Sequence, residues 1–176
     1  MDSHLLRFDK EKTFVFIDFE TENLCLNIRH NIPWQMAMLK AKGDQKFDER
    51  DILIEWDRKL NVSPEAAKIT RFSQDKYNKL KKPHDKVFKL MENWLEEADY
   101  IVGHNVLGFD LYLILEYYKK MGKDGSHLTD KVIDTYALAK AYKLGSEKPS
   151  GASLIEFQYQ LMSIRKRGLG GSLSAM

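Results

Sequence analysis

Two acidic residues, Asp18 and Glu20, follow a short hydrophobic segment, Thr13–Ile17. Because side chains alternate along a β-strand, both carboxylates would lie on one face of it. Two ionised carboxylates at the end of an apolar strand are costly through desolvation and repulsion unless a cation neutralises them. Oxygen-only ligands suit magnesium or manganese. The alternative is a solvated strand end, with Thr21 and Asn23 opening a turn.

A second polar segment, Gly103–Asp110, follows the buried run Tyr100–Val102 and opens a helix. Open α/β sheets place their ligands at such turns. His104 and Asn105 supply hydrogen-bonding groups, and Asp110 offers a third carboxylate from the first helical turn. The alternatives are ordinary: the helix dipole favours an acidic residue at this position, and the two polar residues stabilise the turn.

The elements that must position these residues can be read from periodicity and capping signals. Ser63 before Pro64, and Ser73, would each cap a short helix. Strands are expected at 13–17, 35–42, 51–56, 100–102 and 132–133. The short helix after Ser63 is expected over 66–72, and further helices at 83–98, 108–121, 135–142 and from Ser153. The first strand is apolar on both faces, which predicts cover on both sides. The order predicts an α/β fold, a ribonuclease-H-like mixed sheet flanked by helices.

Composition agrees with one soluble domain, since 43% of the 176 residues are hydrophobic and 31% are charged. A net charge of +2 neither demands nor excludes a polyanionic partner. The single cysteine, Cys25, fits a reducing compartment and predicts a cytoplasmic protein. No run approaches the roughly 18 apolar residues of a membrane span, so no membrane partner is expected.

The two acidic segments resemble the DEDD (DnaQ-like) 3′-to-5′ exonucleases, which include polymerase proofreading domains. Asp18-Phe19-Glu20-Thr21 matches the first family motif, and His104 through Asp110 matches the second, His-Asn-x-x-x-Phe-Asp. Val132-Ile133-Asp134-Thr135 is similar to the later strand-to-helix turn of the family, where the aspartate is usually structural. The resemblance extends in order over roughly 13–162.

The family's third motif, a His or Tyr followed by a fourth metal-binding Asp, is not found. No aspartate follows Asp134, and the last histidine is His127. The expected organisation is a single exonuclease-like domain over 1–164 that lacks this motif, with a flexible or non-native tail over 165–176. The missing acid and base leave the activity of this particular chain open.

The resemblance implies a two-metal hydrolase. Two Mg²⁺ or Mn²⁺ ions, roughly 3.5 to 4 Å apart in such enzymes, would be held by Asp18, Glu20 and Asp110. One ion would activate the attacking water and the other would stabilise the leaving 3′ oxygen. The expected reaction releases nucleoside 5′-monophosphates from single-stranded 3′ ends in proofreading or end trimming. DNA is the preferred substrate, RNA is the alternative, and a DNA polymerase is a further expected partner.

The resemblance also implies substrate contacts. Thr21 would lie at the sugar of the terminal nucleotide, Leu24 or Phe109 would contact a base, and His104 and Asn105 would support the site. Core packing is the preferred alternative for Phe109.

Two other functions stay open: a non-catalytic nucleic-acid or polymerase-binding module with the same fold, and a ribonuclease-H-like hydrolase whose second motif matches by accident. Several lysines could attract a phosphate backbone, although a solvated helix face is the preferred reading for them. These lysines are Lys79, Lys81, Lys82, Lys86, Lys89, Lys119, Lys120 and Lys123.

Overall fold

The computed structural model describes residues 11–24, 31–43 and 45–141. The chain divides into two compact units, Met1–Ile133 and Asp134–Met176, and each is described by itself. A six-stranded sheet has the order β4-β3-β2-β1-β5-β6. Its strands are β1 (Thr13–Thr21), β2 (Pro33–Lys42), β3 (Gln45–Glu55), β4 (Lys82–Pro83), β5 (Tyr100–Gly103) and β6 (Val132–Asp134).

The helices follow the sequence signals closely. They are α1 (Pro64–Thr70), α2 (Gln74–Leu80), α3 (His84–Glu97), α4 (Asp110–Lys120) and α5 (Thr135–Ala141), with a 3₁₀-helix, η2, at Ser126–Lys131. The side chains of Ser63 and Ser73 accept hydrogen bonds from the backbone N–H groups of Ala66 and Lys76, so both predicted caps are confirmed. β4 and η2 were not expected, because two strand residues and a short 3₁₀ segment leave no periodic pattern.

The sheet is mixed, as predicted. β1 is antiparallel to β2, β2 is antiparallel to β3, and β1 is parallel to β5. β1 continues past its predicted end at Ile17, and β3 begins at Gln45, before its predicted start at Asp51. Asp18 and Glu20 therefore lie inside β1, opposite Ala37 and Gln35 of β2. The register of this pairing shifts between Glu20 and Thr21. The shift marks the point where regular pairing gives way to the turn.

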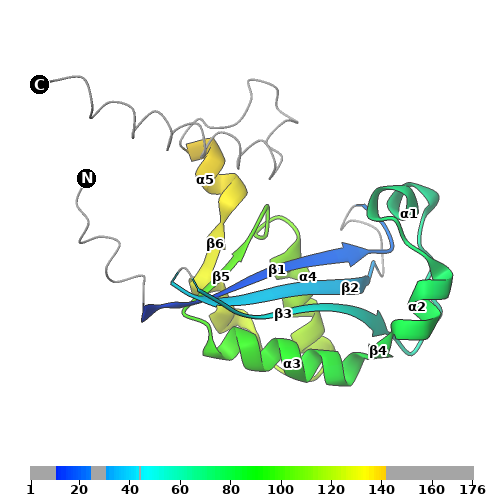
Figure 1. Ribbon diagram of the computed structural model, residues 1–176, viewed down its shortest axis with the longest axis horizontal. Helices are drawn as coiled ribbons and strands as arrows, with labels where there is room; N and C mark the ends of the chain where they lie inside the picture. Colours follow the sequence, from blue (N-terminus) through cyan, green and yellow to red (C-terminus); the bar gives the residue numbers. More distant parts are fainter. Residues whose placement is uncertain (1–10, 25–30, 44, 142–176) are drawn as a thin grey trace, which may run out of the picture. The chain divides into compact units, whose positions relative to one another are not determined.

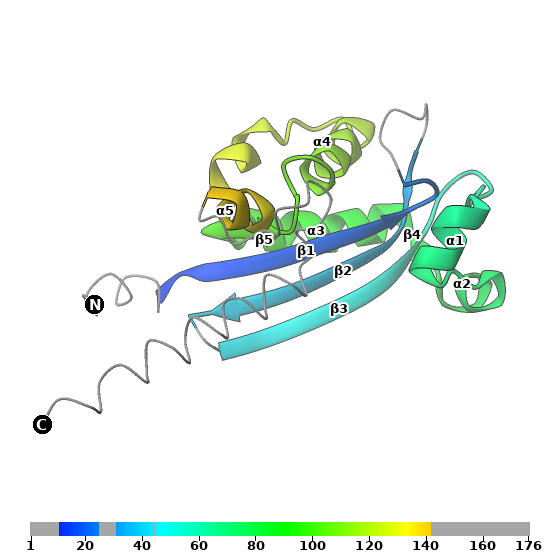
Figure 2. The ribbon, with the colours of Figure 1, turned by 90° about the horizontal axis from the view of Figure 1, so that it is seen from above.

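Helices α3 and α4 lie on the same side of the β1–β3 sheet (Figures 1 and 2). The face of α3 toward the sheet buries residues at three- and four-residue spacing, as the periodicity predicts: Val87, Phe88, Met91, Trp94 and Leu95. Full burial of each such side chain contributes about 1.5 to 3 kcal/mol. The packing of α3 on the sheet therefore fixes the position of β1 in the core.

β1 alternates in burial, which confirms the predicted strand parity. Val15, Ile17 and Phe19 are at most 4% exposed and point into the core. Phe16 lies on the opposite face and keeps 42% of its exposure. The expectation of a strand covered on both faces is therefore wrong at Phe16, because α3 and α4 both pack on the other side.

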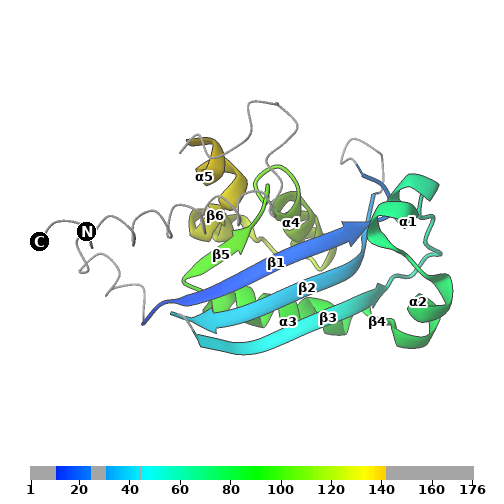
Figure 3. The same cartoon turned by 45° about the horizontal axis from the view of Figure 1, so that its top comes forward.

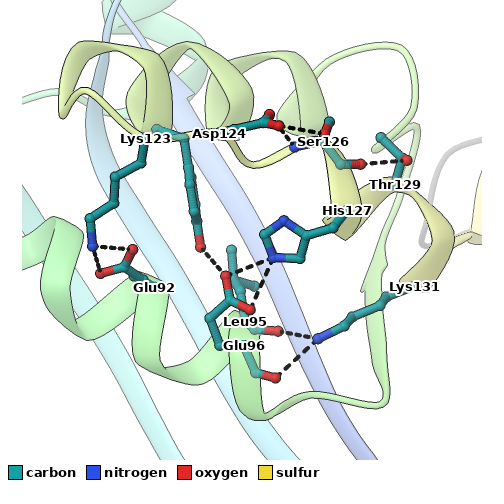
Figure 4. A network of polar contacts seen from close by, with 10 residues as sticks. Glu92, Leu95, Glu96, Lys123, Asp124, Ser126, His127, Thr129 and Lys131 are labelled. Atoms are coloured by element: carbon teal, nitrogen blue, oxygen red, sulfur yellow. Dashed lines mark hydrogen bonds and ion pairs between the residues drawn. The ribbon is translucent and has the colours of Figure 1, made fainter.

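The connection from α4 to β6 is fastened to α3 by charged side chains (Figure 4). Nε2 of His127 lies 2.8 Å from Oε1 of Glu96, and Nζ of Lys123 lies 2.6 Å from Oε1 of Glu92. Nζ of Lys131 donates to the backbone carbonyl of Glu96 at 3.0 Å. These contacts fix the approach of the chain to β6.

The second unit begins at Asp134, whose Oδ1 accepts hydrogen bonds from the N–H groups of Tyr136 (2.8 Å) and Ala137 (3.3 Å). Asp134 therefore caps α5, as predicted. Residues 142–176 lie outside the described part of the chain. The predictions of a helix from Ser153 and of a tail over 165–176 fall there, as does the region where the third motif was sought. Among the described helices, none is long and apolar enough to cross a membrane.

Candidate active site

Asp110 begins α4 and is 2% exposed. Its Oδ1 accepts a hydrogen bond of 3.0 Å from the backbone N–H of Phe19, the residue between Asp18 and Glu20. Helix α4 therefore delivers the third acid to the strand that carries the other two.

The three acids influence one another electrostatically. Burial, and next the charge of Asp18, raise the pKa of Asp110 to about 7, although the Phe19 N–H opposes the shift. Burial and then the charge of Asp18 raise the pKa of Glu20. Burial raises the pKa of Asp18, and the nearby His104 partly offsets that rise. Burial, joined by repulsion at Glu20 and Asp110, thus disfavours the ionised form of each acid, and a bound cation would offset this cost.

The turn between β5 and α4 approaches β1 closely. A Cβ on Gly103 would stand 2.8 Å from Cβ of Val106 and 3.2 Å from the carbonyl oxygen of Ile17. Only glycine leaves room here for the turn to fold against the middle of β1, at Ile17. The backbone N–H of Leu111 donates to the carbonyl of Val106 at 2.8 Å and closes the turn into α4.

The other residues of the second motif, His104, Asn105 and Phe109, lie in three different environments. His104 is near enough to Asp18 to act on its charge. Asn105 adopts a left-handed backbone (φ 60°) and its side chain lies against Gly108, where an added Cβ would meet Oδ1 at 2.7 Å. Phe109 is half-buried and packs against the core, which agrees with the packing alternative.

Thr21 and Leu24 differ in their availability to a ligand. Thr21 is 4% exposed, and its hydroxyl donates to the carbonyl of Asn23 at 2.5 Å. Nδ2 of Asn31 donates to the same Thr21 oxygen at 3.4 Å. The side chain of Leu24, the last residue of the described range 11–24, is 51% exposed. Thr21 thus shapes the strand end, whereas Leu24 presents an apolar surface to solvent.

Sequence reasoning missed Glu22, which is 2% exposed and turns toward the loop before α1. Its two carboxylate oxygens accept hydrogen bonds from the Arg58 guanidinium at 2.9 and 2.5 Å, and Oε1 also accepts from the N–H of Asn61 at 2.5 Å. We call these three residues the Glu22 clamp. By strand parity alone, Glu22 would lie on the same face as Glu20. The register shift between Glu20 and Thr21 leaves no local signal in the sequence, so the different environment of Glu22 could not be predicted.

A comparison with models of known protein families identifies the family of the chain. The family model described as Exonuclease (RNase_T) matches residues 15–164. This chain belongs to that exonuclease family. The match spans the strand with Asp18 and Glu20 and the helix that begins at Asp110, and it supports a nuclease. A search of curated protein sequences gave no significant match.

Solved structures of exonuclease I share the fold of this family member. A product-bound exonuclease I is 16% identical with a TM-score of 0.66, over 79% of this chain and 33% of that one. The E. coli enzyme in complex with a dT13 oligonucleotide is 16% identical with a TM-score of 0.64, over 80% and 33%. An exonuclease I complex with SSB-Ct is 15% identical with a TM-score of 0.63, over 80% and 33%. The exonuclease-family chain thus spans about a third of the length of these proteins.

Exonucleases of this family generally use divalent metal ions. The donor set fits such ions, because the three carboxylates are oxygen ligands whose mutual repulsion a cation would neutralise. Within the described part of the chain, however, no three His, Cys, Asp or Glu side chains are gathered closely enough to enclose an ion. Side-chain movement of Asp18 or Glu20, both on the accessible face of β1, would be needed to close the site.

Proposed function

We propose that this chain is a metal-dependent 3′-to-5′ exonuclease that releases nucleoside 5′-monophosphates from single-stranded 3′ ends, DNA in preference to RNA. The main support for this proposal is a buried hydrogen bond. The backbone N–H of Phe19, between Asp18 and Glu20, donates to the Asp110 carboxylate and so holds the third acid beside the other two. The raised pKa values of the three acids, which come from two distant segments, support a functional role, because gathering carboxylates that resist ionisation does not stabilise the fold.

The residues would divide the work as follows. Asp18 would contribute oxygens to two Mg²⁺ or Mn²⁺ ions, and Glu20 and Asp110 would complete their ligation and orient the water. When bound, the ions supply an activated water and neutralise the developing charge on the 3′ oxygen. Asp110, with a pKa of about 7, would release its proton as a cation binds.

Substrate contacts belong to the same proposal. Leu24 is exposed and would pack against the terminal base, which requires no particular sequence. Thr21 would hold the backbone near the terminal sugar, while His104 and Asn105 would support the turn around the acids. Exonuclease I structures with a bound product and with dT13 support a nucleic-acid substrate. A DNA polymerase partner and a cytoplasmic location stay predictions.

The test is cleavage of 5′-labelled single-stranded DNA and RNA by the chain, and by a version extended along its native reading frame, with magnesium or manganese. A ladder that shortens one nucleotide at a time from the 3′ end is expected. Asp18→Ala should lose it, by more than the roughly 10- to 100-fold that outer-shell partners of metal ligands contribute. Asp130→Asn, a change at an exposed acid, should leave it intact.

Internal cuts would point to an endonucleolytic ribonuclease-H-like hydrolase instead. Oligonucleotide binding without cleavage, in both versions and with either metal, would support the non-catalytic binding module. Either result contradicts the exonuclease proposal.

A further inference from the structure

Lysines and arginines are paired very differently in different parts of the sequence. Before residue 57, every described Lys and Arg forms an ion pair with an Asp or Glu: Lys12, Lys40, Lys42, Lys46 and Arg50. Of the five described lysines after residue 90, three are also ion-paired: Lys119, Lys120 and Lys123. Lys131 donates instead to the backbone carbonyls of Leu95 and Glu96, and Lys140 lies over the ring of Tyr136. A solvated surface of mixed charge behaves in this way.

The segment 57–90 departs from that behaviour. It holds ten Lys and Arg residues against four Asp and Glu, although the whole chain has 28 against 26. Within the described residues, two of the ten form ion pairs, Arg58 with Glu22 and Lys81 with Glu55. The other eight are exposed and form the basic surface: Lys59, Lys68, Arg71, Lys76, Lys79, Lys82, Lys86 and Lys89.

The basic surface spans α1, α2 and the start of α3, which lie together at one end of the sheet (Figures 1 and 3). A cavity of about 670 Å³ opens at this end of the molecule, and Lys59 is the residue of the basic surface that lines it, beside the ion-paired Arg58 and Lys81. Three acids also line the cavity: Glu55 pairs with Lys81, Asp57 pairs with His84 and Lys120, and Asp85 forms no ion pair among the described residues. Together with Glu65 and Asp75, Asp85 makes three acids against the eight cations of the basic surface, so the unbalanced charge of this end is positive.

This end of the molecule is joined directly to the strand with the acidic site. The backbone N–H of Ser63, the cap of α1, donates to the carbonyl of Glu22 at 2.8 Å. The Glu22 clamp adds the bond from Arg58, next to Lys59. The carboxyl end of β1, just past Glu20, therefore lies beside α1, and the figures show the tip of β1 reaching that helix.

We propose that the basic surface holds the phosphate backbone of the single strand whose 3′ end occupies the site of Asp18, Glu20 and Asp110. This inference rests on the proposed function and adds where the upstream nucleotides run. Unpaired ammonium and guanidinium groups bind phosphates without regard to sequence, as trimming of any 3′ end requires. Ile69 and Leu80, exposed by 67% and 56%, offer apolar contacts to bases between the charges.

The test compares the binding of a short oligonucleotide of about 4 nucleotides with that of one of about 16. Fluorescence anisotropy is measured in EDTA, so that cleavage is prevented, at several salt concentrations. The surface variant carries Lys68→Gln, Arg71→Gln, Lys76→Gln and Lys79→Gln. The matched control carries Lys12→Gln, Lys42→Gln, Lys46→Gln and Lys123→Gln, which remove the same charge from ion-paired lysines.

The wild type and the control should bind the long oligonucleotide more tightly than the short one. In the surface variant the affinity for the long oligonucleotide should fall more than about tenfold, and the slope of log K against log salt should become shallower by about 0.7 for each phosphate that the protein no longer neutralises. Short-oligonucleotide binding should be unchanged. With magnesium, KM for the long substrate should rise while kcat stays constant.

Equal long-strand binding by the surface variant and the control would overturn the inference. So would competition by polyglutamate as effective as that by the oligonucleotide, because the surface would then suit an acidic protein. If the wild type cleaves nothing while the salt- and length-dependent binding still requires the basic surface, the exonuclease proposal fails and the binding surface stands.

Discussion

The carboxylate of Asp110 accepts a hydrogen bond from the backbone N–H of Phe19, 91 residues earlier in the sequence, at 3.0 Å. Through this bond the first residue of α4 is attached to β1 between its two acidic side chains. The position of Asp110 therefore depends on the backbone of β1, and the charges of Asp18 and Glu20 act on it at close range.

The raised pKa of Asp110 predicts how stability depends on pH without divalent metal. Its pKa is about 7 in the folded protein and 3.8 ordinarily, so the folded state binds more protons between these values. The free energy of unfolding should fall as pH rises from about 4 to about 7, by up to a few kcal/mol, and level off above.

The measurement is urea unfolding in EDTA across this pH range, with Asp110→Asn beside the wild type. Asparagine keeps an oxygen for the Phe19 N–H and removes the charge, so this contribution to the slope should disappear. Asp130→Asn, at an exposed acid, is the control. An equal slope in the wild type and Asp110→Asn would contradict the assignment.

Divalent cations should stabilise the folded protein through the three acids. With magnesium or manganese at about 100 times its Kd, the free energy of unfolding should rise by about 2.7 kcal/mol. Asp18→Ala should abolish the gain, which thermal unfolding with and without EDTA would measure. A Tm shift of the same size in the Asp18→Ala protein would place the cation elsewhere.

The Glu22 clamp should matter for stability more than an exposed ion pair. Arg58→Met leaves the buried Glu22 carboxylate without its charged partner, and the expected loss is about 3 kcal/mol. Glu22→Gln keeps a hydrogen-bonding side chain of the same size and should cost less. Combined, the two changes should cost less than the sum of the single effects, as denaturant unfolding would measure. Strict additivity would mean that the two side chains do not interact.

Gly103→Ala should destabilise the turn between β5 and α4. The new methyl group would stand 2.8 Å from Cβ of Val106 and against the Ile17 carbonyl, both in packed surroundings, and the expected cost is about 1 to 3 kcal/mol. Gly108→Ala is the matched change, because its methyl group meets the end of the Asn105 side chain, which can turn away. Equal Tm values for the two variants would show that the close approach at Gly103 is not limiting.

Local signals in the sequence were sufficient for most elements. The spacing of Val87, Met91 and Trp94 identified α3, and Ser63 and Ser73 identified two helix starts, because periodicity and capping involve residues a few positions apart. Strand parity correctly assigned Asp18 and Glu20 to one common face, and the structure shows that this face is the one opposite the core. Resemblance to family motifs named Asp110 as their companion.

The tertiary structure decided what depends on distant parts of the chain. It determined that Asp110 bonds to the backbone of Phe19 and acquires a raised pKa, because both effects arise from burial between separate elements. It also determined that the Glu22 carboxylate bonds to Arg58, 36 residues away, just past the point where the β1–β2 register shifts. The amino-acid pattern encodes which face of an element is apolar, whereas the packing of distant segments decides which charged groups meet.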